Sequence, residues 1–446
     1  MESTAIQIIK AFQDAGHDAY FAGGSVRDLL MENEPQDYDI ATSATPDEIE
    51  KIVDGMHLES KTIPIGKQFG VILGVLHGHA FEIATFRSDA AYTDGRRPDA
   101  VMFTSAKEDA LRRDFTINGL FYDPLKKEVL DFVEGQKDIQ NKLIRFIGTP
   151  HERIKEDHLR LLRAIRFRNK FNFKYHPTTE KAVQELAHLV KDISKERIAD
   201  ELNKMMIHPS RARAMKELVE LGLMQELMPE VIQGEGVEQP RQYHQEGDVL
   251  DHSLKALHDM PEGWVSIELA WAVFLHDIGK PATFELAPDR IRFDGHAQVS
   301  AQITRAILKR FKFPKAMITK ITWLIDHHMT VGFIPDMKRI HQVNLFLHPW
   351  FEDLMRLHYC DEHGSLPIDL SLYQKIMALY DEFMNEKLLE DHTQPKLNGN
   401  EIMQITGLKP GPKIKEILHC LREAQIEGGV KTKEEAEGFV REFLQK

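Results

Sequence analysis

The chain has 446 residues, of which 42% are hydrophobic and 28% charged, and its formal net charge at pH 7 is -13. This length predicts three or four compact units rather than one core. No apolar run is long enough to cross a bilayer, and residues 1–16 contain charged side chains where a secretory signal needs an apolar stretch. With only Cys360 and Cys420 present, we expect no disulfide framework and a cytoplasmic location.

The charge is unevenly distributed along the chain. Residues 141–215 contain 17 Lys/Arg and 9 Asp/Glu, a local balance of +8, which leaves -21 for the remainder. A basic stretch in an acidic protein is typical of a local phosphate-binding surface, and the acidic remainder limits unspecific adhesion. The composition is therefore compatible with a nucleic-acid partner. The structural alternative is a solvated, charge-rich helix face.

The first predicted elements are an amphipathic helix at Glu2–Ala15 and an apolar strand after it. That strand ends at Gly23 and Gly24, where backbone N–H groups can approach a phosphate at the start of a short helix. Arg27 lies on this helix and brings a positive charge for a triphosphate.

A second strand is predicted to present Asp37 and Asp39, which are two residues apart and so point to one face. Such a pair is a seat for Mg²⁺ that bridges nucleotide phosphates. Further strands are expected at Val71–Leu76 and Phe81–Phe86. Glu82, in the last of these, is either a third carboxylate of the site or a solvated strand residue. The pattern predicts phosphoryl or nucleotidyl transfer.

Two segments follow that bear on substrate binding. Arg87–Ala106 shows no period, and we expect a loop that acts as a lid. In the string RRDFTINGL at residues 112–120, a helix would place Asp114 and Asn118 on one face, where together they can hold a ribose hydroxyl pair. Arg113 is expected to reach a phosphate.

The segment Glu156–Phe167, EDHLRLLRAIRF, is predicted to be a single amphipathic helix. In the functional interpretation, Arg160 donates to the carbonyl and ring nitrogen of cytosine, Asp157 accepts from its exocyclic amine, and adenine binds in a shifted pose. The alternative is an ordinary ion-paired helix. Arg163 and Arg166 join the expected substrate-binding residues. A capped helix that begins at Ser194 and carries Arg197 is interpreted as structural.

The string GGSVRD before DYD, with the motifs above, resembles the class II transfer-RNA nucleotidyltransferases and bacterial poly(A) polymerases. These belong to the superfamily typified by DNA polymerase beta. The resemblance implies CTP and ATP as substrates and tRNA as partner. It also implies that the Glu-Asp-x-x-Arg pattern at residues 156–160 selects bases without a nucleic-acid template. The complete segment at residues 87–106 favours an enzyme that goes on to the final adenosine.

A polar stretch without period at residues 233–248 predicts a domain boundary, and all later segments read as helices rich in histidine. The order His, His-Asp, His, His-His, Asp suits one or two divalent metals and resembles the HD phosphohydrolase superfamily. The implied activity is metal-dependent hydrolysis, and the ligand types favour Mn²⁺, Ni²⁺ or Co²⁺ over Mg²⁺. The expected ligands are His252, His276, Asp277, His296, His327 and Asp361, with His328 as an open alternative to His327.

The predicted fold class is α+β: a polymerase-beta-like head with a small mixed sheet and helices, then an all-α neck, HD domain and tail. From Gly407, the string GLKPGPKIKEIL suits either phosphate contact or a plain turn between helices. The expected domains are residues 1–143 (nucleotidyltransferase head), 144–232 (nucleotide-recognising, RNA-binding neck), 233–370 (HD domain) and 371–446 (RNA-binding tail).

The predicted function is template-independent addition of CCA to the 3′ end of tRNA by two-metal nucleotidyl transfer, with Asp37 and Asp39 as catalytic residues and Mg²⁺ as cofactor. The HD domain is expected to add a phosphohydrolase activity. The alternatives are an enzyme that adds only the terminal adenosine, a poly(A) polymerase, a protein uridylyltransferase, and a binding module with an inactive head. The sequence leaves the oligomeric state open.

Overall fold

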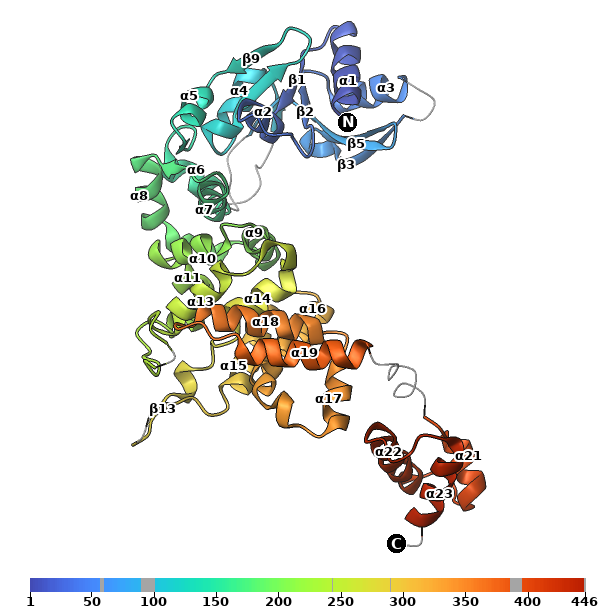
Figure 1. Ribbon diagram of the computed structural model, residues 1–446. Helices are drawn as coiled ribbons and strands as arrows, with labels where there is room; N and C mark the ends of the chain where they lie inside the picture. Colours follow the sequence, from blue (N-terminus) through green and yellow to red (C-terminus); the bar gives the residue numbers. More distant parts are fainter. Residues whose placement is uncertain (57–59, 90–100, 243, 289, 386–394, 445–446) are drawn as a thin grey trace. The chain divides into compact units, whose positions relative to one another are not determined.

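The computed structural model describes residues 1–56, 60–89, 101–242, 244–288, 290–385 and 395–444. The chain divides into two compact units, Met1–Ile232 and Gln233–Lys446 (Figure 1). The finer division of the chain into four domains stays a prediction. None of the helices in the described ranges has the length and apolar character needed to cross a membrane.

Unit 1 begins with a mixed sheet whose strand order is β3-β4-β5-β2-β1-β8-β9. Strands β2 and β5 pair in parallel, and the other neighbours are antiparallel. The strands are β1 (Ala19–Ala22), β2 (Ile40–Thr42), β3 (Lys61–Gly66), β4 (Val71–Leu76), β5 (His79–Thr85), β8 (Leu120–Asp123) and β9 (Glu128–Asp131).

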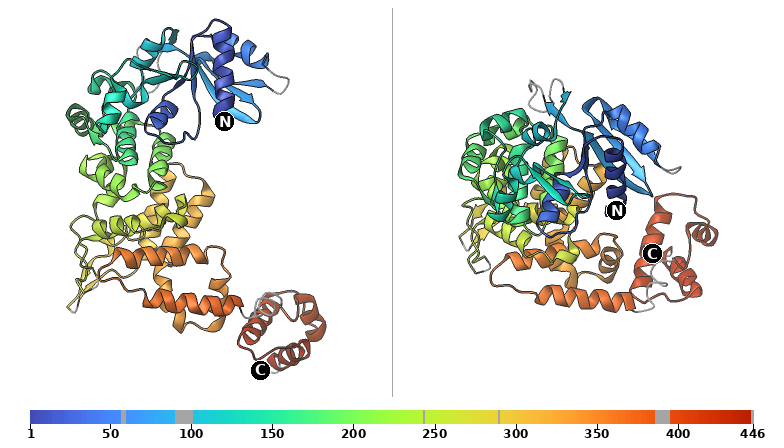
Figure 2. Two further views of the ribbon diagram at one scale, coloured as in Figure 1. Left: turned by 45° about the horizontal axis from the view of Figure 1, so that its top comes forward. Right: turned by 90° about the horizontal axis from the view of Figure 1, so that it is seen from above.

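Both faces of this sheet are covered, because alternate residues of β1 contribute to two different cores. Phe21 packs with Phe12 of α1 (Glu2–Asp14) and Ile49 of α3 (Pro46–Asp54). Its neighbour Tyr20 packs on the opposite face with Ala110 of α4 (Ala106–Leu111). Helix α1, in dark blue, lies along the sheet in Figure 1 and in both views of Figure 2. Strand β2, which follows the two aspartates in the chain, likewise contributes Ile40 to one layer and Ala41 to the other.

Two expectations for the head need correction. Strand β2 begins at Ile40, so Asp37 and Asp39 lie on the segment that leads into it rather than within it. The segment 87–106 is not simply a loop. Its ends form β6 (Arg87–Asp89) and β7 (Val101–Phe103), which pair in antiparallel fashion, and strands this short leave no visible period in the sequence. Residues 90–100 of the expected lid lie outside the described residues.

The rest of unit 1 is helical apart from β10 (Leu143–Ile144), which pairs with β11 (Lys174–Tyr175). The segment 156–167 is not one helix as expected. Asp157 is extended, and its Oδ1 accepts the backbone N–H of Leu159 at 3.1 Å, which ends one helix and starts the next. The helices are α2 (Gly24–Leu30), α5 (Gly135–Gln140), α6 (Pro150–Glu156), α7 (Arg160–Phe171), α8 (Pro177–Glu185), α9 (Lys195–Met206), α10 (Arg211–Glu220), α11 (Leu223–Leu227) and α12 (Pro229–Ile232).

The described part of unit 2 is mainly helical, as predicted. Between α14 and α15, β12 (Glu285–Leu286) and β13 (Ile291–Arg292) form a small antiparallel pair that the sequence did not indicate. The main helices are α13 (Val249–His258), α14 (Ile267–Leu275), α15 (His296–Arg310), α16 (Lys315–His327), α17 (Arg339–Phe346), α18 (Phe351–Gly364) and α19 (Ser371–Asn385).

The last helices, α21 (Gly399–Thr406), α22 (Pro412–Ile426) and α23 (Lys433–Phe443), share a hydrophobic core that includes Ile402, Ile417 and Val440. The turn between α21 and α22 follows the expected pattern. Gly407 ends α21 with φ of +69°, and Pro412 is the first residue of α22.

Candidate active site and metal centre

The head presents a glycine turn between β1 and α2. Gly23 has φ of +67°, and a Cβ at this position would lie 2.8 Å from Nη1 of Arg113. A side chain is therefore excluded both by the backbone and by the close approach of the guanidinium. Gly24 is the first residue of α2, so the turn places Arg113 and the start of α2 side by side.

Three carboxylates lie near this turn, where β2 begins. Asp37 and Asp39 flank the buried Tyr38, and the carbonyl of Asp39 accepts the N–H of Ala22 at 3.0 Å. Because Ile40 pairs with Ile83 in parallel, Glu82 of β5 is the neighbour of Asp39. Burial, together with the charges of Asp37 and Glu82, raises the pKa of Asp39 to about 6, and Arg113 opposes this rise. Such repulsion between carboxylates is relieved by a divalent cation, and oxygen ligands of this kind suit Mg²⁺.

Asp114, Asn118 and Arg27 form one buried network beside the carboxylates. Asn118 lies on a 3₁₀ turn, Thr116–Asn118, rather than on the expected α-helix, yet its Nδ2 donates to Asp114 Oδ1 at 3.1 Å. Its Oδ1 accepts from Arg27 Nη1 at 2.7 Å. Burial would raise the pKa of Asp114, but Arg163 and the hydrogen bond from Asn118 hold it at about 2. The aspartate is thus a fixed anion.

Arg27 is only 5% exposed, which the sequence did not indicate. Its guanidinium contacts Asp28 at 2.7 Å and stacks on Phe171 of α7, 4.5 Å from the ring centroid. Arg113 is also engaged, since its Nη2 lies 3.0 Å from Oδ2 of the buried Asp109. Both arginines are therefore held in fixed orientations by acidic partners.

The two residues expected to read the base do not pair with each other. Arg160 contacts Glu156 at 2.7 Å and also donates to backbone carbonyls, including that of Arg153 at 2.6 Å. Asp157 is held by Arg197 of α9 through two hydrogen bonds of 3.0 and 2.8 Å. The helix break at Asp157 turns its carboxylate toward α9, and sequence reasoning missed Arg197 as its partner.

The other two basic residues expected at the substrate also have acidic partners. Arg163 donates through Nε to Asp114 Oδ2 at 2.7 Å, which joins α7 to the ribose-binding network. Arg166 donates through Nε to the buried Glu201 of α9 at 2.6 Å. Arg163 lies next to the network of Asp114 and Asn118, whereas Arg166 faces α9.

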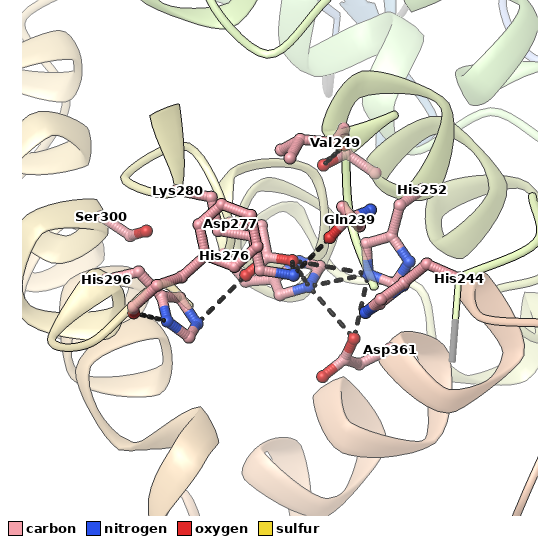
Figure 3. A network of polar contacts seen from close by, with 12 residues as sticks. Gln239, His244, Val249, His252, His276, Asp277, Lys280, His296, Ser300 and Asp361 are labelled. Carbon is pink, nitrogen blue, oxygen red and sulfur yellow. Dashed lines mark hydrogen bonds and ion pairs between the residues drawn. The ribbon is translucent and has the colours of Figure 1, made fainter. Parts of the chain in front are cut away.

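Unit 2 contains a second cluster of ionisable residues (Figure 3). His252 comes from α13, His276 and Asp277 follow α14, and Asp361 lies on α18. Nε2 of His252 is 3.0 Å from Asp361 Oδ1 and 3.2 Å from His276 Nε2, so one ligand atom of each residue lies within 4.8 Å of the others. We call these four residues the first ligand group.

Asp277 also belongs to a second ligand group with His296 and His328. Its Oδ1 is 3.3 Å from His296 Nε2, while its Oδ2 is 3.3 Å from His276 Nε2. Figure 3 shows His296 and His252 on opposite sides of Asp277. One carboxylate thus lies between two ligand groups, the arrangement that bridges a pair of metal ions.

The structure corrects one expected ligand. His328, not His327, faces the second group, with its Nε2 3.2 Å from Nε2 of His296. His327 stacks on Trp323 with a centroid distance of 4.3 Å, and its Nδ1 pairs with the carbonyl of Trp323. The two histidines are neighbours at the end of α16, so they point in different directions around the helix axis.

The charges of this cluster fit a bound cation. Against the effect of burial, the histidines hold the pKa of Asp277 and of Asp361 well below the usual range. The same two carboxylates raise the pKa of the buried His276 to about 10, so without a metal this ring holds a proton, which a bound metal ion would displace. Imidazole and carboxylate donors that converge in a buried place, with fixed negative charge, suit a divalent metal ion.

Two further residues at this cluster were not expected. Lys280, in the same HDIGK string, contacts Asp277 Oδ2 at 2.6 Å and Gln239 Oε1 at 2.7 Å. Its spacing of three residues from Asp277 was a usable signal. Glu246 contacts Nδ1 of both His244 and His252, but it lies in the polar stretch interpreted only as a boundary.

Comparison with known proteins gives the class to which this fold belongs. Residues 19–145 match the poly A polymerase head domain, and residues 249–385 match the HD domain. Residues 172–233 match a family described as "Probable RNA and SrmB-binding site of polymerase A". The protein is thus a nucleotidyltransferase-type chain with a poly(A) polymerase head and an HD domain.

Full-length relatives give the family. The CCA-adding enzyme of Bacillus cereus (strain ATCC 10987 / NRS 248) is 30% identical, with 99% of this chain and 97% of that protein covered. The chain belongs to the family of CCA-adding enzymes. The crystal structure of the Bacillus stearothermophilus CCA-adding enzyme in complex with CTP has a TM-score of 0.71 at 25% identity, over 99% of this chain and 97% of that one. The Thermotoga maritima CCA-adding enzyme complexed with tRNA shares the fold, with a TM-score of 0.61 at 19% identity over 99% and 95%.

Proposed function

We propose that this protein adds CCA to the 3′ end of tRNA, with CTP and ATP as substrates and without a nucleic-acid template. The observation that carries the proposal is the grouping of Asp37, Asp39 and Glu82 beside the network of Asp114 and Asn118. The relatives support it, because one solved CCA-adding enzyme is in complex with CTP and another with a tRNA. We infer a cytoplasmic location, since the chain's two cysteines, both in described segments, are not joined by a disulfide.

In this proposal Asp37 and Asp39 hold Mg²⁺, with Glu82 as a third carboxylate. The metal supplies a lowered pKa for the attacking 3′-hydroxyl and charge neutralisation for the triphosphate. The turn at Gly23 and Gly24 receives the triphosphate, with Arg27 and Arg113 as nearby positive charges. Because both arginines already have fixed acidic partners, they act as oriented charges rather than as mobile clamps.

Asp114 and Asn118 are proposed to hold the ribose, and Asp157 and Arg160 to select the base. Arg197 holds both oxygens of Asp157 on one side. Oδ1 also accepts the N–H of Leu159, whereas Oδ2 has a second lone pair and can still accept from an exocyclic amine. Arg163 of α7 links this set to Asp114, and Arg166 of the same helix is held by Glu201 of α9.

The test is incubation of the full-length protein with tRNA that ends at the discriminator base, with Mg²⁺, CTP and ATP, followed by sequencing of the products. Addition of CCA and then arrest is the expected result. Addition of adenosine only to tRNA that already ends in CC would identify an enzyme specific for the last step, and long adenosine tails would identify a poly(A) polymerase. Transfer of uridine to a protein, with no product on tRNA, would contradict the proposal.

A second function is favoured by the two ligand groups of unit 2. We propose that this HD centre hydrolyses phosphomonoesters or 2′,3′-cyclic phosphates with a transition metal. Neutral imidazoles favour Mn²⁺, Ni²⁺ or Co²⁺ over Mg²⁺. Asp277 lies between the two groups and is positioned to serve both. The test is release of phosphate from p-nitrophenyl phosphate and opening of 2′,3′-cyclic AMP, each with these metals and with Mg²⁺ alone.

A further inference from the structure

The four histidines of the HD centre all present Nε2 to the cluster, but one of them is oriented in a different way. Nδ1 of His276, His296 and His328 lies 2.8, 2.8 and 2.6 Å from the backbone carbonyl three residues earlier in the chain. Nδ1 of His252 instead faces a carboxylate oxygen, Oε1 of Glu246, at 3.1 Å. Three ligands are thus oriented by neutral carbonyl groups and the fourth by a charged side chain.

Glu246 is itself fixed at several points. Its side chain is 2% exposed. Oε1 also faces Nδ1 of His244 at 2.7 Å, and Oε2 accepts the backbone N–H of Leu366 at 2.9 Å. Leu366 follows α18, the helix that carries Asp361. Its carbonyl accepts the N–H of Gln245 at 3.0 Å, so the segment of Glu246 is tied to the end of α18 by backbone as well as by side chain.

His244, Glu246 and His252 are close enough to form a third metal-binding group by distance alone. The chemistry of imidazole argues against that reading. Nε2 of His252 already faces the first ligand group, and an imidazole that binds a metal through Nε2 carries its proton on Nδ1. That N–H is a donor and needs an acceptor, which Glu246 supplies.

We propose that Glu246 is a positioning residue of the HD centre, a role that rests on the metal-binding function proposed above. It accepts Nδ1–H of His252 and so turns Nε2 toward the metal. Its negative charge makes the imidazole of His252 a stronger metal ligand. Its hydrogen bond from Leu366 couples the orientation of His252 to α18, the helix that carries Asp361. Outer partners of this kind typically change metal affinity 10- to 100-fold.

The experiment is a titration of the metal-free full-length protein with Co²⁺, in which the visible d–d absorption of the bound Co²⁺ is measured. We expect Glu246→Gln to weaken binding of the first Co²⁺ by about 10- to 100-fold, because the amide is neutral and has one acceptor oxygen for His252 and Leu366. The matched control is His244→Gln, which removes the other partner of the same oxygen and should change affinity by less than about threefold. The thermal transition of each metal-free variant reports whether the fold is retained.

The same substitution in a His252→Gln variant tests whether Glu246 acts by positioning His252 or by supporting the fold in general. If Glu246 acts through His252, Glu246→Gln should have little further effect on Co²⁺ affinity in a His252→Gln chain. Equal losses in both backgrounds, or no loss in the wild-type background, would overturn the proposal. A wild-type protein that binds no Co²⁺ would instead refute the metal centre itself, so the two failures are distinguishable.

Discussion

Asp157 and Arg197 form a two-point ion pair, with N–O distances of 3.0 and 2.8 Å, that joins the break between α6 and α7 to the first turn of α9. Both side chains are partly buried, with 19% and 24% of their surface exposed. The pair fixes the plane of the carboxylate that we propose to accept the exocyclic amine of the incoming base. We therefore propose that Arg197 influences nucleotide selection through Asp157.

Arg197→Met should therefore relax base selection rather than simply slow the reaction. We expect preference for CTP and ATP over UTP and GTP to fall about tenfold, since an oriented contact to a base edge is worth about 1–3 kcal/mol. The nucleotide preference of Arg197→Lys should lie between those of the wild type and Arg197→Met, because lysine keeps the charge but cannot bind two oxygens in a fixed plane.

Asp200→Asn is a suitable control, because Asp200 lies on the same helix and its ion pair with Lys204 is exposed. Single-nucleotide addition with each NTP in turn measures the preference. If Arg197→Met lowered the rate equally for all nucleotides, the ion pair would be structural only.

Asp39→Ala should abolish nucleotide addition while tRNA binding stays within a few-fold of the wild type. The carboxylate serves the metal and not the RNA phosphates, so its loss removes the chemistry and spares the basic surface. Product formation at saturating Mg²⁺ and a filter-binding assay with tRNA are the two measurements. Asp14→Asn, in the exposed pair with Lys10, provides a control. Appreciable addition by the Asp39 variant would refute the metal seat.

The stretches that could be predicted from sequence are those where one residue has a local physical requirement. Gly23 needs positive φ and space beside Arg113, and the glycine pair in the sequence indicated a turn at this place. The helical pattern of α1 and the turn at Gly407 are also local. In each case the determining interactions lie within a few residues.

Two of the features that could not be predicted depend on contacts far apart in the sequence, and a third depends on a local hydrogen bond. Arg197 is 40 residues from Asp157, and Glu246 is tied to Leu366 across 120 residues. The break at Asp157 depends on one side-chain hydrogen bond to Leu159, which competes with a helix pattern that continues on both sides. The polar composition of residues 233–248 gave no sign that the carboxylate of Glu246 would be buried against His252, an expected metal ligand.

Acid stability should depend on Asp114. Its pKa is about 2 in the folded protein, below the ordinary value, because Arg163 and Asn118 outweigh the effect of burial. A lowered pKa stabilises the fold above the unfolded value near pH 4, and that stabilisation disappears as the pH falls toward 2. Asp114→Asn should therefore lower the free energy of unfolding by about 2 kcal/mol at pH 7, with a difference that shrinks below pH 4.

Urea titrations of the two proteins between pH 2 and 7 test this expectation. Asp14→Asn should show no such change, because its ion pair is exposed. A stability difference that is the same at every pH would mean that Asp114 contributes shape and not charge.

The two proposed activities should separate by mutation. Asp277→Ala should eliminate metal uptake and phosphate release by the HD centre but leave CCA addition intact, because Asp277 lies between both ligand groups of that centre alone. Asp37→Ala should do the reverse. Metal content by mass spectrometry, phosphate release and CCA addition are measured on each variant. Loss of both activities in either variant would contradict two independent centres.

The adjacent residues His327 and His328 provide the sharpest test of the second ligand group. His328 faces His296 at 3.2 Å between the Nε2 atoms, whereas His327 stacks on Trp323. His328→Ala should reduce the bound metal from two ions to one and lower phosphate release by about 100-fold, the scale expected when a two-metal site loses one ion. His327→Ala should keep both ions, because it removes a stacking contact and a hydrogen bond to Trp323 but no residue of either ligand group. Metal stoichiometry after dialysis against Mn²⁺ distinguishes the two variants. If His327→Ala lost an ion and His328→Ala kept both, the assignment of the second group would be reversed.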